Sequence, residues 1–230
     1  MRHLITSTLL DSYEWLVSCP ESWKPRALDD FVAMIRREPR PVSDACERGI
    51  EFERLVCDNC DRMSHEDFRR FVASRYSGWL KGDPLERAVE SVCDVADSCR
   101  GGMQQVAVMK DVCIDGKEFH LFGYADVVFP DRIVDIKTTG NYKGDGSYLK
   151  RSQHFLYSLC AGISDFEYVV AVFRGKYPAC VERIRTRVSE QECMSVLERR
   201  IRNVTRFLEN AGLWNDYENH FTGGHKDRKN

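Results

Sequence analysis

The chain has 230 residues, a formal net charge of −2, 43 % hydrophobic residues and 30 % charged residues. This composition is typical of a globular protein with a large core, and the near-neutral charge excludes a uniformly basic nucleic-acid-binding surface. No apolar run approaches the roughly 18 residues of a membrane span, and the first residues carry no secretory signal. We therefore expect a cytoplasmic protein without a membrane partner, in a bacterium or in the host cell if the source is viral.

The spacing of apolar residues predicts a helical first half followed by strands. Spacings of three and four residues indicate helices over 6–18, 28–37, from 43 onwards, over 67–80 and over 85–98. After Gly101–Gly102 the period becomes two, which is typical of strands, over 106–114, 119–129, 133–138, 166–173 and 181–188. Further helices are predicted over about 148–162 and 189–210, and a disordered tail over 222–230.

This order predicts an α/β fold with a mixed sheet: three meandering strands, a crossover helix and two further strands, with helical decoration at the N-terminus. Asp115–Gly116 favours a two-residue hairpin turn between the first two strands. Pro130–Asp131 fits such a turn poorly, so the next turn is expected to be longer. We expect one domain over 1–221, mainly helical over 1–100, with the sheet and last helix over 101–221.

Two acids interrupt the apolar strand patterns on either side of the Pro130–Asp131 turn. Any even-length turn centred on that pair places Asp126 opposite Asp135. Like charges at opposed positions destabilise a sheet, and their burial adds a desolvation cost. A divalent cation would convert this cost into a binding site, because Mg²⁺ binds one or two carboxylates together with water and phosphate oxygens.

Lys137 lies two residues after Asp135 and therefore on the same strand face. A lysine there can stabilise developing negative charge or help to deprotonate a metal-bound water. The backbone carbonyl of Ile136, between the two, can serve as a further metal ligand if the strand edge is irregular. An Asp-x-Lys triplet also occurs on solvated strand faces, so the triplet alone does not identify a site.

Taken with later residues, these spacings resemble the signature of the PD-(D/E)XK nuclease superfamily, in its branch of RecB-type and CRISPR-associated exonuclease domains. The matching motifs are Gly123-x-x-Asp126, Asp135-x-Lys137 and Gln153-x-x-x-Tyr157. The resemblance implies a restriction-endonuclease-like core and hydrolysis of DNA phosphodiesters with one or two Mg²⁺ or Mn²⁺ ions. Asp126 and Asp135 would be metal ligands and Lys137 the catalytic lysine. Gln153 and Tyr157 would form a helix face that meets the substrate backbone or the active-site water.

The same branch has a Gly-x-x-x-His or Gly-x-x-x-Glu motif on a helix before the strands, and Gly49-x-x-x-Glu53 matches it. By this resemblance Glu53 is a third metal ligand and part of the catalytic group. The alternative is an ordinary exposed acid on the helix surface. Residues 7–23 also resemble the opening helix of the branch, through less specific residue types.

Ten cysteines are scattered beside apolar residues, which is typical of buried thiols in a reducing compartment. Cys57-x-x-Cys60 has no second pair at zinc spacing, so core packing is expected, with metal or redox use as the alternative. An iron–sulfur cluster is not expected, because the late cysteines, Cys160, Cys180 and Cys193, are too dispersed. His154 is expected to be a packed or solvated histidine.

Nucleic-acid contact requires basic and aromatic side chains near the acids. Five follow Lys137 in the sequence: Tyr142, Lys143, Tyr148, Lys150 and Arg151. The cations can contact phosphates without reading sequence, and the tyrosines can stack on bases. The other arginine groups are expected on solvated faces: Arg183, Arg185 and Arg187 on one strand, and Arg199, Arg200, Arg202 and Arg206 on the last helix.

The sequence therefore predicts a metal-dependent DNA nuclease, an exonuclease or an enzyme that processes DNA ends or single strands. It would act alone, as phage-type nucleases do, or with a recombination, repair, replication or CRISPR-type partner protein. The alternative is a nuclease-fold module that binds DNA or protein and no longer cuts. A cysteine-based metal or redox protein is the third hypothesis.

Overall fold

The structure is a computed structural model that describes residues 2–144 and 146–221. Its helices are α1 (Ser7–Ser18), α2 (Lys24–Ile35), α3 (Asp44–Cys57), α4 (His65–Tyr76), α5 (Asp83–Cys99), α6 (Gln153–Ala161), α7 (Glu190–Asn210) and α8 (Trp214–His220), with 3₁₀ turns η1 (Glu21–Trp23) and η2 (Ser147–Lys150). Its strands are β1 (His3–Ile5), β2 (Met103–Ile114), β3 (Lys117–Val128), β4 (Arg132–Thr139), β5 (Asp165–Arg174) and β6 (Tyr177–Arg187). The mixed α/β fold that the sequence predicts is confirmed.

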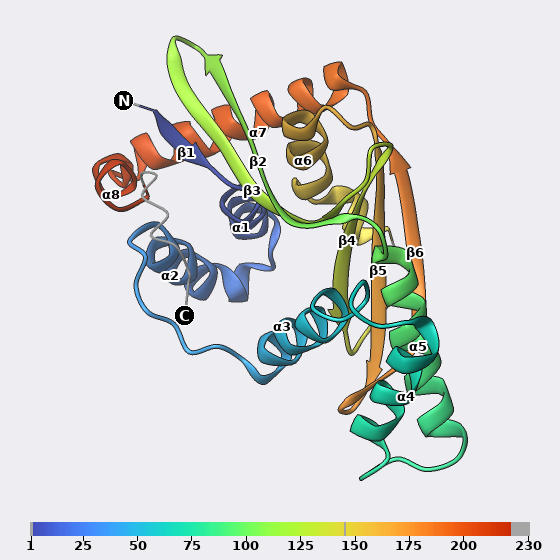
Figure 1. The fold of residues 1–230 in the computed structure, drawn as a ribbon. Coiled ribbons are helices and arrows are strands. Elements are labelled where there is room, and N and C mark those ends of the chain that lie inside the picture. The colour runs from blue at the N-terminus through green and yellow to red at the C-terminus, as the bar shows by residue number, and fades with distance from the viewer. Residues whose placement is uncertain (1, 145, 222–230) are drawn as a thin grey trace.

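The strands form one six-stranded sheet in the order β1-β3-β4-β5-β6, with β2 paired to β3 (Figure 1). β2 and β3 are antiparallel along their whole length and meet at the predicted Asp115–Gly116 turn. β4 and β5 are parallel and are connected through α6, whereas β5 and β6 are antiparallel. The predicted meander, crossover helix and two further strands are therefore all present.

The edge of β3 that faces away from β2 is divided between two strands. β1 pairs with Phe119–Leu121, and β4 pairs with Val127–Val128. Within the described part of the chain, no strand pairs with residues 122–126 along this edge. The two β3–β4 pairs have the register that places Asp126 opposite Asp135, and the ladder opens at that step. The sheet thus has a gap where the sequence places its acids.

Helices cover both faces of the sheet, and each face has its own apolar core (Figure 1). The core on the side of α1, α2, α6 and α7 includes Leu10, Phe31, Leu156, Tyr168 and Ile201. The core on the side of α3, α4 and α5 includes Phe52, Phe68, Val92, Val134 and Val169. Because β5 contributes alternate residues to both cores, its sequence is almost continuously apolar, as expected for a strand covered on both faces.

The helix predicted over about 148–162 is wrong in its first part. Residues 147–150 form the 3₁₀ turn η2, Arg151 is extended, and α6 begins only at Gln153. The break is held by Arg200 of α7, which donates to the Lys150 carbonyl at 2.6 Å and to the Ser152 hydroxyl at 2.5 Å. Arg200 is buried, not on the wet side of α7 as predicted, because this part of α7 meets η2 and α1.

Two short elements escape the sequence pattern, because β1 has only three residues and α8 only seven. They support one another, since the Tyr217 hydroxyl donates to the Leu4 carbonyl at 2.6 Å. The first helix is capped by Thr6, whose side chain accepts the Leu9 N–H at 3.2 Å. The predicted disordered tail, 222–230, lies outside the described residues. None of the described helices is both long and apolar enough to cross a membrane.

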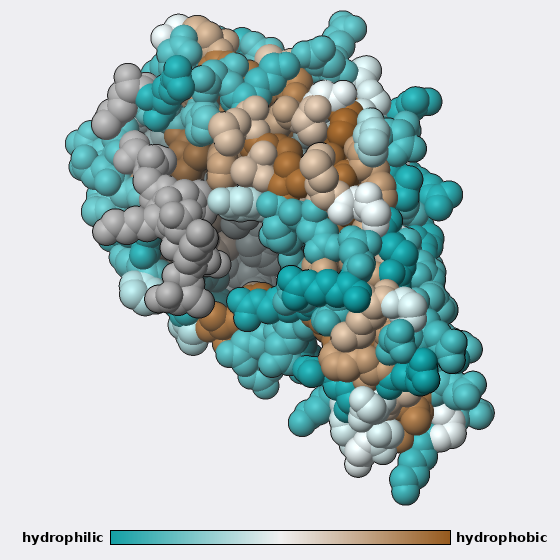
Figure 2. Space-filling view, viewed as in Figure 1, coloured by the Kyte–Doolittle hydropathy of each residue, from teal (hydrophilic) through white to brown (hydrophobic). Residues whose placement is uncertain are grey.

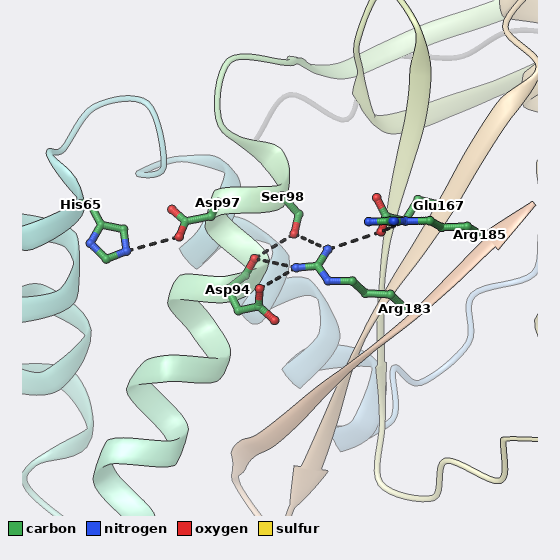
Figure 3. A network of polar contacts seen from close by, with 7 residues as sticks. All are labelled: His65, Asp94, Asp97, Ser98, Glu167, Arg183 and Arg185. Carbon is green, nitrogen blue, oxygen red and sulfur yellow. Dashed lines mark hydrogen bonds and ion pairs between the residues drawn. The ribbon is translucent and has the colours of Figure 1, made fainter.

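On the α5 side of the sheet, a buried carboxylate is neutralised by two arginines (Figure 3). Glu167 of β5 is 5 % exposed and accepts a hydrogen bond from Arg185 Nε at 2.9 Å. Arg183 lies 3.5 Å from the same oxygen and donates to Asp94 at 2.6 Å and to Ser98 at 2.7 Å, both on α5. This group, which we call the back network, fastens α5 to β5 and β6.

Candidate active site

Three acids and a lysine meet where β3 and β4 separate, and we call them the acid cluster. Asp126 ends the gap in β3, Asp135 and Lys137 project from β4, and Glu53 comes from α3. The carboxylates are near enough to raise one another's pKa, as described below. The structure therefore brings together residues from three of the four motifs on which the sequence prediction depends.

Asp135 is the most enclosed member of the acid cluster, with no exposed surface. Lys137 Nζ lies 2.6 Å from its Oδ2 as an ion pair, without the direction of a good hydrogen bond. Gln153, the first residue of α6, donates from Nε2 to Oδ1 at 2.5 Å. The predicted Gln153 helix face thus contacts the acid directly, because α6 begins where its first side chain reaches β4.

Asp126 takes over a backbone hydrogen bond at the point where the strands separate. Its Oδ2 accepts the N–H of Ile136 at 2.8 Å, which is the bond that a continued ladder would give to the β3 backbone. The N–H and C=O of one strand residue point to the same edge. The carbonyl of Ile136, predicted as a metal ligand, therefore also faces the opening.

Glu53 reaches the cluster because α3 packs unusually close to β4. A Cβ added to Gly49 would lie 2.9 Å from Thr138 Oγ1, so this approach requires glycine. Glu53 is partly buried and accepts a hydrogen bond from Gln105 Nε2 at 2.5 Å. This environment differs from that of an ordinary exposed helix acid, which was the alternative.

Tyr157 enters the site through a second close approach. A Cβ added to Gly123 would lie 2.4 Å from Tyr157 Cε1, so only glycine leaves room for this ring. The tyrosine is buried, and burial together with the charge of Asp135 raises its pKa to about 12. Its hydroxyl is therefore protonated at neutral pH. The Gly123-x-x-Asp126 spacing thus combines a packing requirement with a carboxylate.

The acid cluster contains three carboxylates and one ammonium, and this excess of acids shifts their pKa values. Burial raises the pKa of Asp126 well above its usual range, and the charges of Asp135 and Glu53 raise it further. Burial also raises the pKa of Asp135 in spite of Lys137, and burial with Asp135 raises that of Glu53. Burial lowers the pKa of Lys137, but Asp135 and Asp126 more than offset this, so its pKa is raised. One ammonium thus serves three carboxylates.

This donor set fits a divalent cation in its chemistry. Carboxylate and carbonyl oxygens are hard ligands suited to Mg²⁺ or Mn²⁺, and the buried negative charge exceeds what Lys137 neutralises. Among residues 2–144 and 146–221, no three His, Cys, Asp or Glu side chains have the arrangement of a preformed metal site. The oxygens are instead engaged by protein donors, from Gln105, Gln153, Lys137 and the Ile136 N–H. A cation would replace some of these contacts.

Of the acid cluster, Lys137 lines the first of two clefts, and Figure 2 shows this face of the molecule hollowed between the β2–β3 hairpin and α3. The first cleft, of about 690 Å³, is lined by Lys137, Gln153, Lys150, Arg151 and one face of α1. The second, of about 900 Å³, is lined by β3 and by the connection between α2 and α3. The two share residues 7–8, Arg40 and Tyr157, so they form a continuous depression.

Of the five predicted DNA-binding residues, the structure places two in the first cleft, Lys150 and Arg151. Lys143 is exposed and Tyr142 partly buried on the loop before η2. The prediction of an open stacking ring does not hold for Tyr148, which is 8 % exposed and packs on Tyr168 with ring centroids 5.5 Å apart. Its ring is also covered by the Arg151 guanidinium at 5.0 Å. It is a core residue that positions Arg151, not an open stacking surface.

Sequence reasoning missed three residues that hold the site in place. Gln105 of β2 orients Glu53, as described above. Asp11 of α1 accepts the Ser152 N–H at 2.7 Å, and Arg200 binds the same segment just before Gln153. Arg200 Nη1 and Asp11 Oδ1 are 3.7 Å apart. No local pattern could have identified these residues, since their partners are distant in the chain.

The cysteines and His154 lie outside the acid cluster. Cys57 and Cys60 are buried free thiols in the core beneath α5, in agreement with the packing prediction. His154 is 1 % exposed, and its Nδ1 lies 3.0 Å from the Tyr168 hydroxyl. Burial lowers its pKa to about 4, so it is a neutral packed histidine.

No protein-family model matches the chain, and no curated protein matches it significantly. Solved structures that resemble it include a candidate exonuclease from Eubacterium rectale, 13 % identical, with a TM-score of 0.49 over 92 % of this chain and 82 % of that one. Another is the alkaline exonuclease LHK-Exo from Laribacter hongkongensis, 13 % identical, with a TM-score of 0.41 over 90 % of this chain and 93 % of that one. LHK-Exo has also been solved in complex with dAMP. The observed order of meander, crossover helix and two strands agrees with the PD-(D/E)XK-like resemblance of the sequence.

Proposed function

We propose that residues 1–221 act as one nuclease domain that hydrolyses DNA phosphodiesters with Mg²⁺ or Mn²⁺. The observation that supports this most directly is the acid cluster, in which three carboxylates share one lysine at a gap in the sheet. A purely structural role does not explain such a group, because buried like charges destabilise a fold. Carboxylates with perturbed pKa values are a feature of functional sites, and their partner Lys137 lines the first cleft.

In this proposal Glu53, Asp126, Asp135 and the Ile136 carbonyl hold the cation. When bound, a divalent ion supplies a Lewis acid and a water of lowered pKa for attack on phosphorus. The raised pKa of Lys137 keeps it an ammonium, so its role is to stabilise negative charge that develops on the phosphate rather than to accept a proton.

Gln153 and Tyr157 have supporting roles one helical turn apart on α6. The Gln153 amide fixes the orientation of Asp135 through Oδ1. Tyr157, neutral because its pKa is raised to about 12, presents a hydroxyl donor where both clefts meet. Lys150 and Arg151 face the first cleft and can neutralise phosphates of the strand that enters it. We infer an exonuclease or end-processing activity, because these cations line the same cleft as Lys137 of the acid cluster.

Cleavage assays on end-labelled linear, circular and single-stranded DNA, with Mg²⁺, Mn²⁺ or EDTA, test this proposal. We expect metal-dependent cleavage that Asp135→Asn lowers by at least about 10³-fold. Asp131→Asn is the matched control, because Asp131 is exposed in the β3–β4 turn, and it should retain activity within about twofold.

Full activity of Asp135→Asn on DNA would refute the assignment. A protein donor already binds each of the three carboxylates. This observation favours one competing function, a DNA-binding module that holds no cation and no longer cuts. Calorimetric titration separates the two, because the silent module would show no divalent-cation binding to the wild type and no dependence on Asp135.

A further inference from the structure

Trp15 of α1 presents an aromatic ring inside the first cleft. The residue is 51 % exposed and lines the cleft together with Lys137 and Gln153 of the candidate active site. Over residues 2–144 and 146–221, its indole has no hydrogen bond, no aromatic neighbour and no cation above it. The ring is therefore open to a ligand that enters the cleft.

Exposure alone does not distinguish Trp15, because Trp23 and Trp79 are 53 % and 51 % exposed. Single exposed apolar residues are common on protein surfaces and need no functional explanation. Trp23 and Trp79 line neither of the two clefts, whereas Trp15 shares the first cleft with a member of the acid cluster. The position of Trp15, and not its exposure, therefore calls for a role.

A short series of contacts connects Trp15 to the acid cluster. Asp11 lies one helical turn before Trp15 on the same face of α1, about 6 Å along the helix axis. Asp11 accepts the Ser152 N–H at 2.7 Å, and the next residue, Gln153, donates to Asp135 at 2.5 Å. Trp15 thus stands one helical turn from the contact that anchors the segment orienting Asp135.

Charge in the first cleft is divided between its two sides. The side formed by β4, η2 and the residue after η2 carries Lys137, Lys150 and Arg151. The α1 residues that line the cleft include no cation and place Glu14 beside Trp15. Phosphates are attracted to the first side, whereas a base offers amino donors to a carboxylate and a flat face to an indole. The cleft therefore favours a strand with its phosphates toward η2 and its bases toward α1.

The first cleft suits an unpaired base better than a duplex. Its volume of about 690 Å³ lies within the range of small-ligand sites, about 300–1,000 Å³. Inside a duplex, both faces of a base are covered by its stacked neighbours. An indole can therefore stack only on a base at a strand end or in a single strand.

We propose that Trp15 stacks on an unpaired base of the DNA substrate while Lys150 and Arg151 bind phosphates of the same strand. The inference rests on the proposed nuclease function and adds the strand state of the substrate and the residue that recognises it. Stacking holds the strand against α1 and so keeps its backbone on the side of Lys137. No sequence preference is expected, because every base has a π face.

Fluorescence anisotropy with a labelled oligothymidine tests the proposal, using the full chain in EDTA so that no strand is cut. Trp15→Leu should weaken single-strand binding roughly tenfold and leave the binding of a circular duplex within about twofold. Trp15→Phe retains a ring and should bind the single strand within about threefold of the wild type. Trp23→Leu is the matched control, equally exposed but outside both clefts, and should bind as the wild type does.

The fluorescence of the indole provides a second measurement, because a base stacked on an indole quenches its emission. Trp15 is one of four tryptophans in the chain. Oligothymidine should quench the emission of the wild type and of Trp23→Leu, but not that of Trp15→Leu. A strand of abasic sites keeps the phosphates and should bind the wild type without quenching it, about as weakly as oligothymidine binds Trp15→Leu. The two wild-type titrations do not depend on how well any variant folds.

Three results overturn the proposal: unchanged single-strand binding by Trp15→Leu, an equal loss in Trp23→Leu or on duplex DNA, and equal wild-type affinity for abasic and intact strands. None of them bears on metal-dependent cleavage, which the Asp135→Asn assay measures separately. A protein that cuts DNA without any quenching of Trp15 would contradict this inference alone. Quenching of Trp15 together with full activity of Asp135→Asn would contradict the nuclease assignment alone.

Discussion

Two buried carboxylates occupy neighbouring positions of the same sheet and have opposite surroundings. Asp135 and Glu167 lie on the paired strands β4 and β5, one register step apart, since Asp135 pairs with Tyr168 and Val134 with Glu167. They point to opposite faces. Glu167 meets two arginines in the back network (Figure 3), whereas Asp135 shares one lysine with two further acids.

We interpret the difference as one between a structural use of buried charge and the functional use proposed for the acid cluster. In the back network Glu167 and Asp94 face Arg183 and Arg185, so the formal charges cancel and each group has a partner. Paired and hydrogen-bonded charges can be buried at tolerable cost. In the acid cluster the charges do not cancel, which costs stability and, in the proposed function, is offset by a bound cation. The following predictions test this distinction, beginning with the largest expected effect.

Lys137→Ala should abolish most of the activity, because it removes the ammonium that forms an ion pair with Asp135. We expect cleavage to fall by about 10³-fold in a single-turnover assay with saturating Mg²⁺. Lys176→Ala, in the β5–β6 turn, is the control and should cut normally. An active Lys137→Ala protein would mean that the acid cluster does not depend on its cation, and the comparison would fail.

Glu167→Gln should lower stability and leave cleavage unchanged, in contrast to Lys137→Ala. It leaves Arg183 and Arg185 without their common carboxylate, and we expect the free energy of unfolding to fall by about 2 kcal/mol, less than for a fully buried pair because Arg185 is exposed. Cleavage at a permissive temperature should not change. Denaturation in urea measures the first quantity, and a loss of activity without a loss of stability would show that the back network also serves the site.

Arg200→Lys should have an intermediate effect, because Arg200 is buried like the back network but holds the segment that begins α6. A lysine cannot reach both the Lys150 carbonyl and the Ser152 hydroxyl. We expect kcat to fall roughly tenfold, since Gln153 loses its alignment, with little change in KM. Arg202→Lys, an exposed neighbour on α7, is the control; a change in KM alone would contradict a positioning role.

The smallest effect is a pH dependence of stability. The folded-state pKa values of Asp126, Asp135 and Glu53 lie above their unfolded values. The folded state therefore binds protons first as pH falls, so this contribution to stability is present at acidic pH and is lost as pH rises from about 4 through the folded pKa values. Asp126→Asn should remove part of this loss and be relatively more stable at pH 8 than at pH 4.5.

Chemical denaturation of both proteins across that pH range, without divalent ions, measures the difference. If the difference in unfolding free energy between the two proteins stays constant with pH, folding does not raise the pKa of Asp126. Adding Mg²⁺ should stabilise the wild type more than Asp126→Asn, which connects this small effect to the proposed cation.

Much of the fold and three of the four members of the acid cluster are local in sequence. Strand and helix periods predicted most elements, and the register around Pro130–Asp131 placed Asp126 opposite Asp135 because a hairpin relates residues only a few positions apart. Lys137 followed from the two-residue alternation of one strand. These features depend on backbone geometry over about ten residues, which a short stretch of sequence determines by itself.

The rest depends on contacts between distant segments. The approach of Glu53 requires α3 to pack on β4 at Gly49, and its partner Gln105 lies 52 residues later. Arg200 was predicted on a wet face because α7 alone cannot indicate that η2 and α1 cover it. Tyr148 was predicted to be open for the same reason. The sequence by itself determined which acids and which lysine lie around the β3–β4 turn, and only the tertiary structure decided which neighbours each group meets, because burial and pairing belong to the assembled layers.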